Sequence, residues 1–235
     1  MGRAFEFRKE RKFKRWGNMA KLFTRYGREI TMAVKEGGAD PNYNAKLRAI
    51  IQNAKSDNVP KDNIERAIKK ATDKDTADYK TVTFEGYAPH GVAVFIECAT
   101  DNNTRTVANI RSYFNKYEGN LATNGSVVFL FDKKALFIVK DNGSDLEELE
   151  LELIDFGAEE IFKTDDEIHI YAEFTSFGNM QKALEERGFE IDKAETDMIP
   201  TDTKKLSEED QEEVNKLIEK IEDDDDVVKV FHNMA

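Results

Sequence analysis

The spacing of apolar residues changes near residue 80, and no other feature of the sequence constrains the fold as strongly. Before that point, apolar residues recur every three or four positions, as they do on one face of a helix. Residues 20–36, 44–57 and 60–68 each show this helical period. From Lys80 the apolar residues alternate or run together over 81–87 and 91–100, which is typical of strands. The sequence therefore predicts a helical N-terminal region followed by α+β structure.

Two α+β units are expected after the helical region. Residues 80–132 predict two strands, then a helix over 101–117 and a strand over 126–131. Residues 133–199 predict the order βαββαβ, a split-βαβ arrangement that is complete in itself. A further helix over 207–221 and a strand over 227–231 must therefore pack against the incomplete unit. The predicted fold class is α+β with three domains: an N-terminal three-helix bundle (1–75), a discontinuous α+β domain (80–132 plus 200–235), and a ferredoxin-like α+β domain inserted into it (133–199).

The charges are distributed very unevenly along the chain. The formal net charge of the whole sequence is −12. Residues 1–75 contain 19 Lys and Arg against 10 Asp and Glu, a net charge of +9, whereas the remaining residues contain 16 basic and 37 acidic side chains, a net charge of −21. A phosphate backbone responds to the local potential rather than to the total charge, so the basic part can bind nucleic acid although the protein is acidic.

Ten cationic side chains within residues 3–28 are the candidate nucleic-acid contacts. Phe5, Phe7, Phe13 and Trp16 are interleaved with them, and aromatic rings stack on unpaired bases. The alternative is a solvated tail that its aromatic residues anchor to the helices. The candidates are Arg3, Arg8, Lys9, Arg11, Lys12, Lys14, Arg15, Lys21, Arg25 and Arg28, of which the last three share one helix face.

A second candidate lies where a strand meets a helix, at residues 100–106 (TDNNTRT). Asn, Asp and Thr side chains cap the free N–H groups of a helix, and such helix ends bind anions. Capping accounts for most of this cluster but not for Arg105 and Arg111, which are therefore candidate secondary contacts. Residues 120–126 are interpreted as a turn.

No catalytic or cofactor motif is visible in the sequence. It lacks the G-x-S-x-G, G-x-x-x-x-G-K-[ST] and G-x-G-x-x-G patterns. His90, His169 and His232 are far apart, and His169 is expected to face solvent. The acidic run at 223–226 lacks the ligand spacing of a calcium loop, so a solvated helix end is expected there rather than a cation site. We therefore expect no enzymatic activity, no cofactor, no metal and no small-molecule substrate.

Cysteine usage and hydropathy bear on the compartment. Cys98 lies in an apolar run and is expected to be a buried strand thiol in a reducing environment. No stretch approaches the roughly 18–20 uninterrupted apolar residues of a membrane span. The N-terminal residues are charged where a signal peptide is apolar. The sequence predicts a cytoplasmic location and no membrane partner.

Several short motifs, taken in order, resemble those of one family nearly end to end. They are KLFT (21–24) with REI (28–30), GGADP (37–41), NVPKDNIERAI (58–68), EGY (85–87), TDN (100–102) with RT (105–106), GS (125–126), MIP (198–200), and EDDDDV (222–227) with HN (232–233). The chain thus resembles the YebC/PmpR family of probable transcriptional regulators, which also includes the mitochondrial translational activator of cytochrome oxidase. The resemblance implies an N-terminal helical domain and two α+β domains.

The sequence also departs from the family pattern. Phe5 stands where the family has a tryptophan, and His90 and Glu118 each replace a glycine. These departures indicate a divergent branch, whose target need not be that of other members.

Three functions stay open at this point. The leading hypothesis is a non-enzymatic, nucleic-acid-binding regulator of gene expression, and by family association a DNA-binding transcriptional regulator. The first alternative is a translation factor that binds ribosomal RNA or the ribosome through the basic helical domain. The second alternative is a protein-interaction adaptor that acts through its acidic α+β domains, with the basic arm binding an acidic partner.

Overall fold

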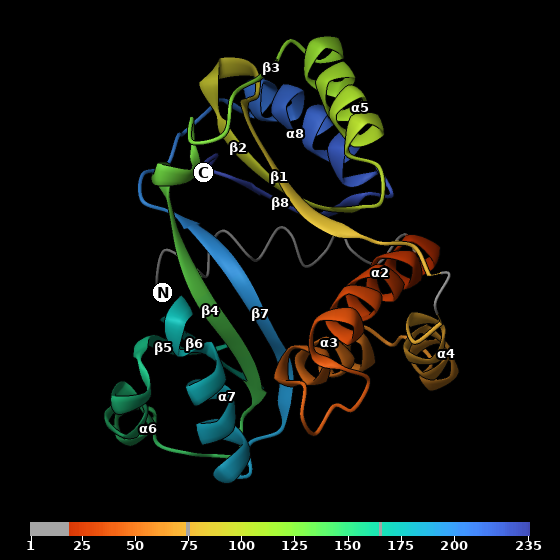
Figure 1. The fold of residues 1–235 in the computed structure, drawn as a ribbon. Coiled ribbons are helices and arrows are strands. Elements are labelled where there is room, and N and C mark those ends of the chain that lie inside the picture. The colour runs from red at the N-terminus through yellow and green to blue at the C-terminus, as the bar shows by residue number, and fades with distance from the viewer. Residues whose placement is uncertain (1–18, 74–75, 165) are drawn as a thin grey trace. The chain divides into compact units, whose positions relative to one another are not determined.

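The structure is a computed structural model that describes residues 19–73, 76–164 and 166–235. Its elements are helical up to residue 71 and then include both strands and helices (Figure 1). Packing divides the chain into two compact units. Within the described residues, the first unit comprises Ala33–Thr72 and Lys133–Ile199, and the second comprises Ala20–Met32, Asp73–Asp132 and Pro200–Ala235.

The helical N-terminal region consists of α2 (Met19–Gly37), α3 (Ala45–Ser56) and α4 (Lys61–Ala71). Asn44 fixes the turn between α2 and α3. Its Oδ1 accepts a hydrogen bond from the backbone N–H of Leu47 (3.0 Å), and its Nδ2 donates to the carbonyls of Ala33 and Gly38 (both 2.8 Å). Gly38 has φ +88°, a conformation that favours glycine just after a helix. The residues of α2 belong to both compact units, and the domain boundary expected near residue 75 stays a prediction.

The second unit contains a four-stranded sheet with the strand order β3-β1-β2-β8. Strand β2 pairs antiparallel with both β1 and β8. Helices α5 and α8 cover one face of this sheet (Figure 1), where Ile110, Phe114, Leu217 and Ile221 are buried against strand residues such as Ile96. The elements are β1 (Lys80–Tyr87), β2 (Ala93–Thr100), α5 (Asn103–Lys116), β3 (Asn120–Leu121), α8 (Glu208–Glu222) and β8 (Val227–His232).

A buried carboxylate organises the segment after β3. Glu85 is 3 % exposed, and its two carboxylate oxygens accept hydrogen bonds from the backbone N–H groups of Gly125 (2.7 Å), Val127 (2.6 Å) and Val128 (2.9 Å). Burial by itself raises the pKa of Glu85, but these backbone hydrogen bonds outweigh it and hold the pKa below its ordinary value.

The prediction of a strand over 126–131 is wrong because of the same hydrogen bonds to Glu85. The N–H groups of Val127 and Val128 bond to Glu85, so they are not available to a neighbouring strand. The chain instead forms a short 3-10 helix, Val128–Leu130, and the next strand begins at Phe131.

Helix α5 ends with a residue in the left-handed conformation. Glu118 has φ +58°, and the N–H of Gly119 bonds back to the carbonyl of Phe114 (2.8 Å). This arrangement is a Schellman motif, in which the left-handed position is usually glycine. The glycine that the family pattern has at this position is therefore explained by the backbone.

The first unit contains the second four-stranded sheet, with the strand order β5-β6-β4-β7. That order is the ferredoxin-like one expected from the βαββαβ pattern. One face of this sheet is buried against the apolar sides of α6 and α7. The buried residues include Leu153 on α6 and the strand residues Phe137, Val139, Ile168 and Ile170. The elements are β4 (Phe131–Lys140), α6 (Leu146–Leu153), β5 (Ala158–Thr164), β6 (Glu167–Glu173), α7 (Phe177–Glu186) and β7 (Ile191–Pro200).

The expected fold class is confirmed: the protein is α+β, with an N-terminal helical region and two further α+β domains. Cys98 is buried in β2, as predicted. The expectation that His169 faces solvent is wrong. The residue is 8 % exposed, because its ring stacks on that of Phe162 in the neighbouring strand β5, with 5.1 Å between the ring centroids.

Candidate nucleic-acid interface

Three of the ten candidate contacts, Lys21, Arg25 and Arg28, lie in the described part of α2. Nε of Arg25 lies 3.5 Å from Oε1 of Glu29, one helical turn later. The guanidinium group of Arg25 also lies over the ring of Tyr26. The other seven candidates lie outside the described residues: Arg3, Arg8, Lys9, Arg11, Lys12, Lys14 and Arg15.

Arg28 binds acceptors of the sheet in the second unit. Its Nη1 donates to Oδ1 of Asp226 (2.7 Å), to the carbonyl of Asp225 (2.5 Å) and to the carbonyl of Ala99 (3.1 Å). The side chain is only 14 % exposed. Arg28 therefore has a structural role: it links α2 to the residues that directly precede β8.

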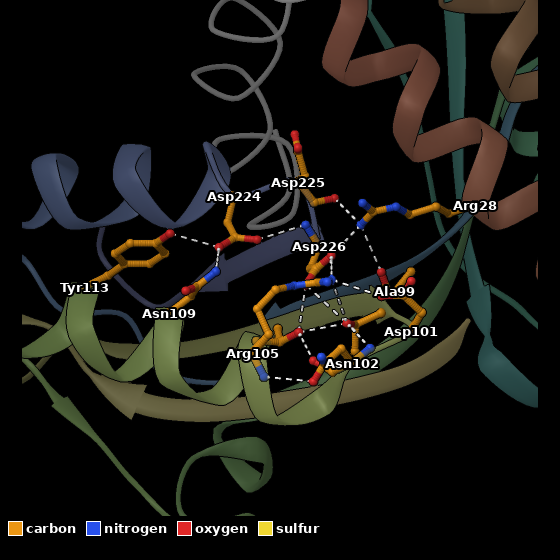
Figure 2. Close-up of polar contacts among 12 residues, drawn as sticks. Arg28, Ala99, Asp101, Asn102, Arg105, Asn109, Tyr113, Asp224, Asp225 and Asp226 are labelled. Carbon is orange, nitrogen blue, oxygen red and sulfur yellow. Dashed lines mark hydrogen bonds and ion pairs between the residues drawn. The ribbon is translucent and has the colours of Figure 1, made fainter. Parts of the chain in front are cut away.

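Asp226 is the centre of a polar group that we call the Asp226 cluster: Asp226 with Arg28, Thr100, Arg105 and Thr106 (Figure 2). The residue is 3 % exposed. Its Oδ2 accepts from Nη2 of Arg105 (2.8 Å), from Oγ1 of Thr106 (2.7 Å) and from Oγ1 of Thr100 (3.1 Å). Both carboxylate oxygens thus have partners, as a buried charge requires.

The electrostatics of the cluster favour an ionised Asp226. Burial raises the pKa of this carboxyl, but the hydrogen bonds from Arg105 and Thr106 and the charge of Arg28 outweigh it and lower the pKa. The bond to Asp226 in turn raises the pKa of Arg105. The cluster is therefore a fixed set of ion pairs and hydrogen bonds at neutral pH.

The backbone of Arg105 takes part in the N-terminal cap of α5, and its side chain forms ion pairs. Its backbone N–H donates to Oδ1 of Asn102 (3.1 Å), the N-cap of α5, and its Nη2 also pairs with Asp101 (3.0 Å). The side chain is 46 % exposed. Arg111, further along α5, is exposed, and no ion pair joins it to another described residue.

The acidic run 223–226 is only partly solvated, so the expectation of a solvated helix end is wrong for two of its members. Asp224 accepts hydrogen bonds from Nδ2 of Asn109 (3.0 Å) and from the hydroxyl of Tyr113 (2.9 Å), which lie on α5 (Figure 2). Burial and this bond raise the pKa of Tyr113 to about 12. Only four residues join α8 to β8, and the short connection directs Asp224 and Asp226 inward. Asp223 pairs with Lys21 at 2.5 Å.

The structure thus brings together two predicted contacts, Arg28 and Arg105, that the sequence placed in separate candidate sites. The residue that joins them, Asp226, was missed, as were the contributions of Thr100 and Thr106. One signal was available in the sequence: Asp226 directly precedes the apolar strand residues Val227 and Val228, where a side chain is close to the core.

Exposed cations are also present on α4 in the first unit. Arg66 and Lys69 are exposed, and Lys61 pairs with Glu65 at 3.4 Å. Across the described residues, no three His, Cys, Asp or Glu side chains group as metal ligands. None of the described helices has the length and apolar character to cross a membrane.

Family models match nearly the whole chain. The model described as the TACO1/YebC protein N-terminal domain matches residues 3–74, and the model described as the TACO1/YebC second and third domain matches residues 79–234.

Similar proteins support the same assignment. A probable transcriptional regulatory protein of Flavobacterium psychrophilum is 63 % identical, covering 100 % of this chain and 99 % of that protein. Another of Porphyromonas gingivalis is 58 % identical, covering 100 % and 97 %. The crystal structure of a conserved hypothetical protein from Aquifex aeolicus aligns with a TM-score of 0.80 at 36 % identity, covering 94 % of this chain and 91 % of that one. The resemblance seen in the motifs is confirmed, and the chain belongs to the TACO1/YebC family.

Proposed function

We propose that this protein is a non-enzymatic regulator of gene expression that binds nucleic acid, and that its target is DNA. The segregation of charge carries the proposal. Residues 1–75 carry a net charge of +9, whereas the rest of the sequence carries −21. Only the basic part therefore attracts phosphates. The names of similar proteins, which are probable transcriptional regulatory proteins, support a role in transcription. The buried thiol of Cys98 is consistent with action in the reducing cytoplasm.

The cations contribute unequally in this proposal. Arg28 and Arg105 bind Asp226, so their guanidinium groups are less available to a phosphate. We assign most of the phosphate contacts to the seven cations of residues 3–15, because positive charge is densest there along the sequence. The exposed Arg66 and Lys69 on α4 are further candidates.

The test is a salt titration of the full-length protein with labelled duplex DNA and with a ribosomal RNA fragment. Each phosphate contact contributes a slope of roughly −0.7 to −0.9 in a plot of log K against log salt. Replacing Arg11 and Lys12 together by alanine should flatten the slope by about one to two units and weaken binding to all sequences similarly. Lys205 and Lys216, both exposed in the acidic part of the chain, provide the matched control pair.

Three results would contradict the proposal. Binding that is insensitive to salt removes the electrostatic basis. Equal losses in the Lys205/Lys216 control pair would show that the basic part has no special role. Tighter binding to the ribosomal RNA fragment than to DNA would replace the transcriptional role by a translational one.

A further inference from the structure

We propose that Asp226 is a positioning residue for nucleic-acid binding: it holds the first half of α2 against the sheet of the second unit and so fixes the helix that follows the basic residues 3–15 in the sequence. The inference rests on the proposed function. Asp226 itself has no role in contacting nucleic acid, because it is negatively charged and 3 % exposed.

The geometry of the contact carries the inference. Arg28 is the link, since one guanidinium nitrogen reaches a side-chain oxygen of Asp226 and the backbone carbonyls of Asp225 and Ala99 (Figure 2). About two turns earlier on the same helix, Lys21 pairs with Asp223. The first half of α2 is thus tied at two points to the connection between α8 and β8.

The rest of the Asp226 cluster makes this link rigid. Thr100, Arg105 and Thr106 all donate to Oδ2, so the carboxylate cannot rotate away from Arg28 without losing three other hydrogen bonds. The substitution Asp226→Asn removes the charge and one acceptor while nearly preserving the volume. It therefore leaves Arg28 buried without a counter-ion and allows α2 to leave its position.

Positioning and simple electrostatics predict opposite effects on affinity. Removing a negative charge from a nucleic-acid-binding protein should strengthen binding, if charge alone matters. If Asp226 positions α2, the competent arrangement becomes a minor state and the apparent Kd rises in inverse proportion to its population. A competent population of about one tenth gives an apparent Kd about tenfold higher. The salt slope should not change, because the same phosphates are contacted once the protein is bound.

The experiment compares the full-length protein with Asp226→Asn and with Asp225→Asn as the matched control. Asp225 is the adjacent acid and is exposed, and only its backbone carbonyl contacts Arg28. Its substitution removes the same charge without removing the carboxylate that binds Arg28. We expect Asp226→Asn to weaken duplex DNA binding about tenfold at an unchanged salt slope. Asp225→Asn should bind as tightly as the unaltered protein or slightly more tightly.

Hydrogen exchange of the amides in residues 21–32 provides an independent readout. Asp226→Asn should accelerate their exchange, whereas Asp225→Asn should not. If Asp226→Asn leaves both the exchange and the affinity unchanged, the inference is overturned. A flatter salt slope would also overturn it, because the loss would then be that of a phosphate contact.

A milder variant covers the case in which Asp226→Asn does not fold. Arg28→Lys keeps the charge of α2 but loses the planar fork of the guanidinium. We expect faster exchange in residues 21–32 and weaker binding at an unchanged slope, and an unchanged affinity would contradict the inference. If the unaltered protein binds no nucleic acid, the proposed function fails and this role of Asp226 fails with it. Normal binding in every variant removes the inference alone.

Discussion

Replacing Glu85 by glutamine should destabilise the second unit, because three backbone N–H groups depend on its two oxygens. Oε1 accepts from Gly125, and Oε2 accepts from both Val127 and Val128. Glutamine has nearly the same shape, but one of the two positions becomes an NH₂ group. At least one backbone N–H then faces another donor in a site that is 3 % exposed.

The magnitude follows from these contacts. A buried donor that loses its acceptor costs about 1–3 kcal/mol, and hydrogen bonds to a charged group are stronger than neutral ones by about 1 kcal/mol each. If the amide oxygen keeps the Oε2 position, one N–H loses its partner and two bonds are weakened. We therefore expect Glu85→Gln to lower the free energy of unfolding by about 3–5 kcal/mol.

The pH dependence has a defined sign. The folded-state pKa of Glu85 lies below its ordinary value of 4.5, so its stabilising contribution is fully present above pH 4.5. It is lost as the pH falls through the lower folded-state pKa. The difference in unfolding free energy between the unaltered protein and Glu85→Gln should thus be largest near neutral pH and shrink in acid.

Urea unfolding at several pH values, together with hydrogen exchange of the amides from Gly125 to Val128, measures both effects. Glu212→Gln, at an exposed position on α8, is the control for loss of one acidic charge. Stability of Glu85→Gln within about 0.5 kcal/mol of the unaltered protein would refute the reasoning. So would a difference between the two proteins that stays constant down to pH 2.

Two further substitutions test the backbone requirements of the same sheet. Gly86→Ala should destabilise the protein by about 1–3 kcal/mol, since its Cβ would lie 2.7 Å from both the carbonyl oxygen of Asn120 and the ring of Phe114. Gly27→Ala, where nothing lies within 4 Å of the new Cβ, is the control, and thermal unfolding of both checks the contrast. Glu118→Gly should stabilise the protein by about 0.5–1 kcal/mol, because it relieves a left-handed φ of +58°. A lower melting temperature for Glu118→Gly would contradict that account.

Much of the fold could be predicted because the relevant signals are local. The strand and helix periods over residues 133–199 give the βαββαβ order directly, and its completeness implies that β8 must join the other sheet. The prediction of a strand over 126–131 failed because the contact that determines the structure there comes from a distant part of the sequence. The apolar residues there have strand character, but the carboxylate that captures their N–H groups comes from Glu85, 42 residues before Val127.

The candidate site was predictable only as a region of charge. The basic residues of α2 are evident in the sequence, but the pairing of Arg28 with Asp226 joins residues 198 positions apart. A run of four acids is usually solvated, and apart from the position of Asp226 next to the strand, nothing in the sequence distinguishes the inward-facing Asp224 and Asp226 from the exposed Asp223 and Asp225. Topology decides the difference, since a four-residue connection between α8 and β8 leaves room for only some of the side chains to reach water.

The position of β8 at the edge of its sheet has a consequence for synthesis on the ribosome. Strands β1 and β2 emerge more than a hundred residues before β8, so β2 has one unpaired edge for most of the time that the chain is being made. The ferredoxin-like segment lies between them in the sequence and can fold in that interval as a unit of its own. During the same interval Arg28 has no Asp226 to bind. The nascent chain therefore exposes both an unpaired strand edge and a free basic helix, which are surfaces that a chaperone or the ribosome itself can cover until residues 226–232 arrive.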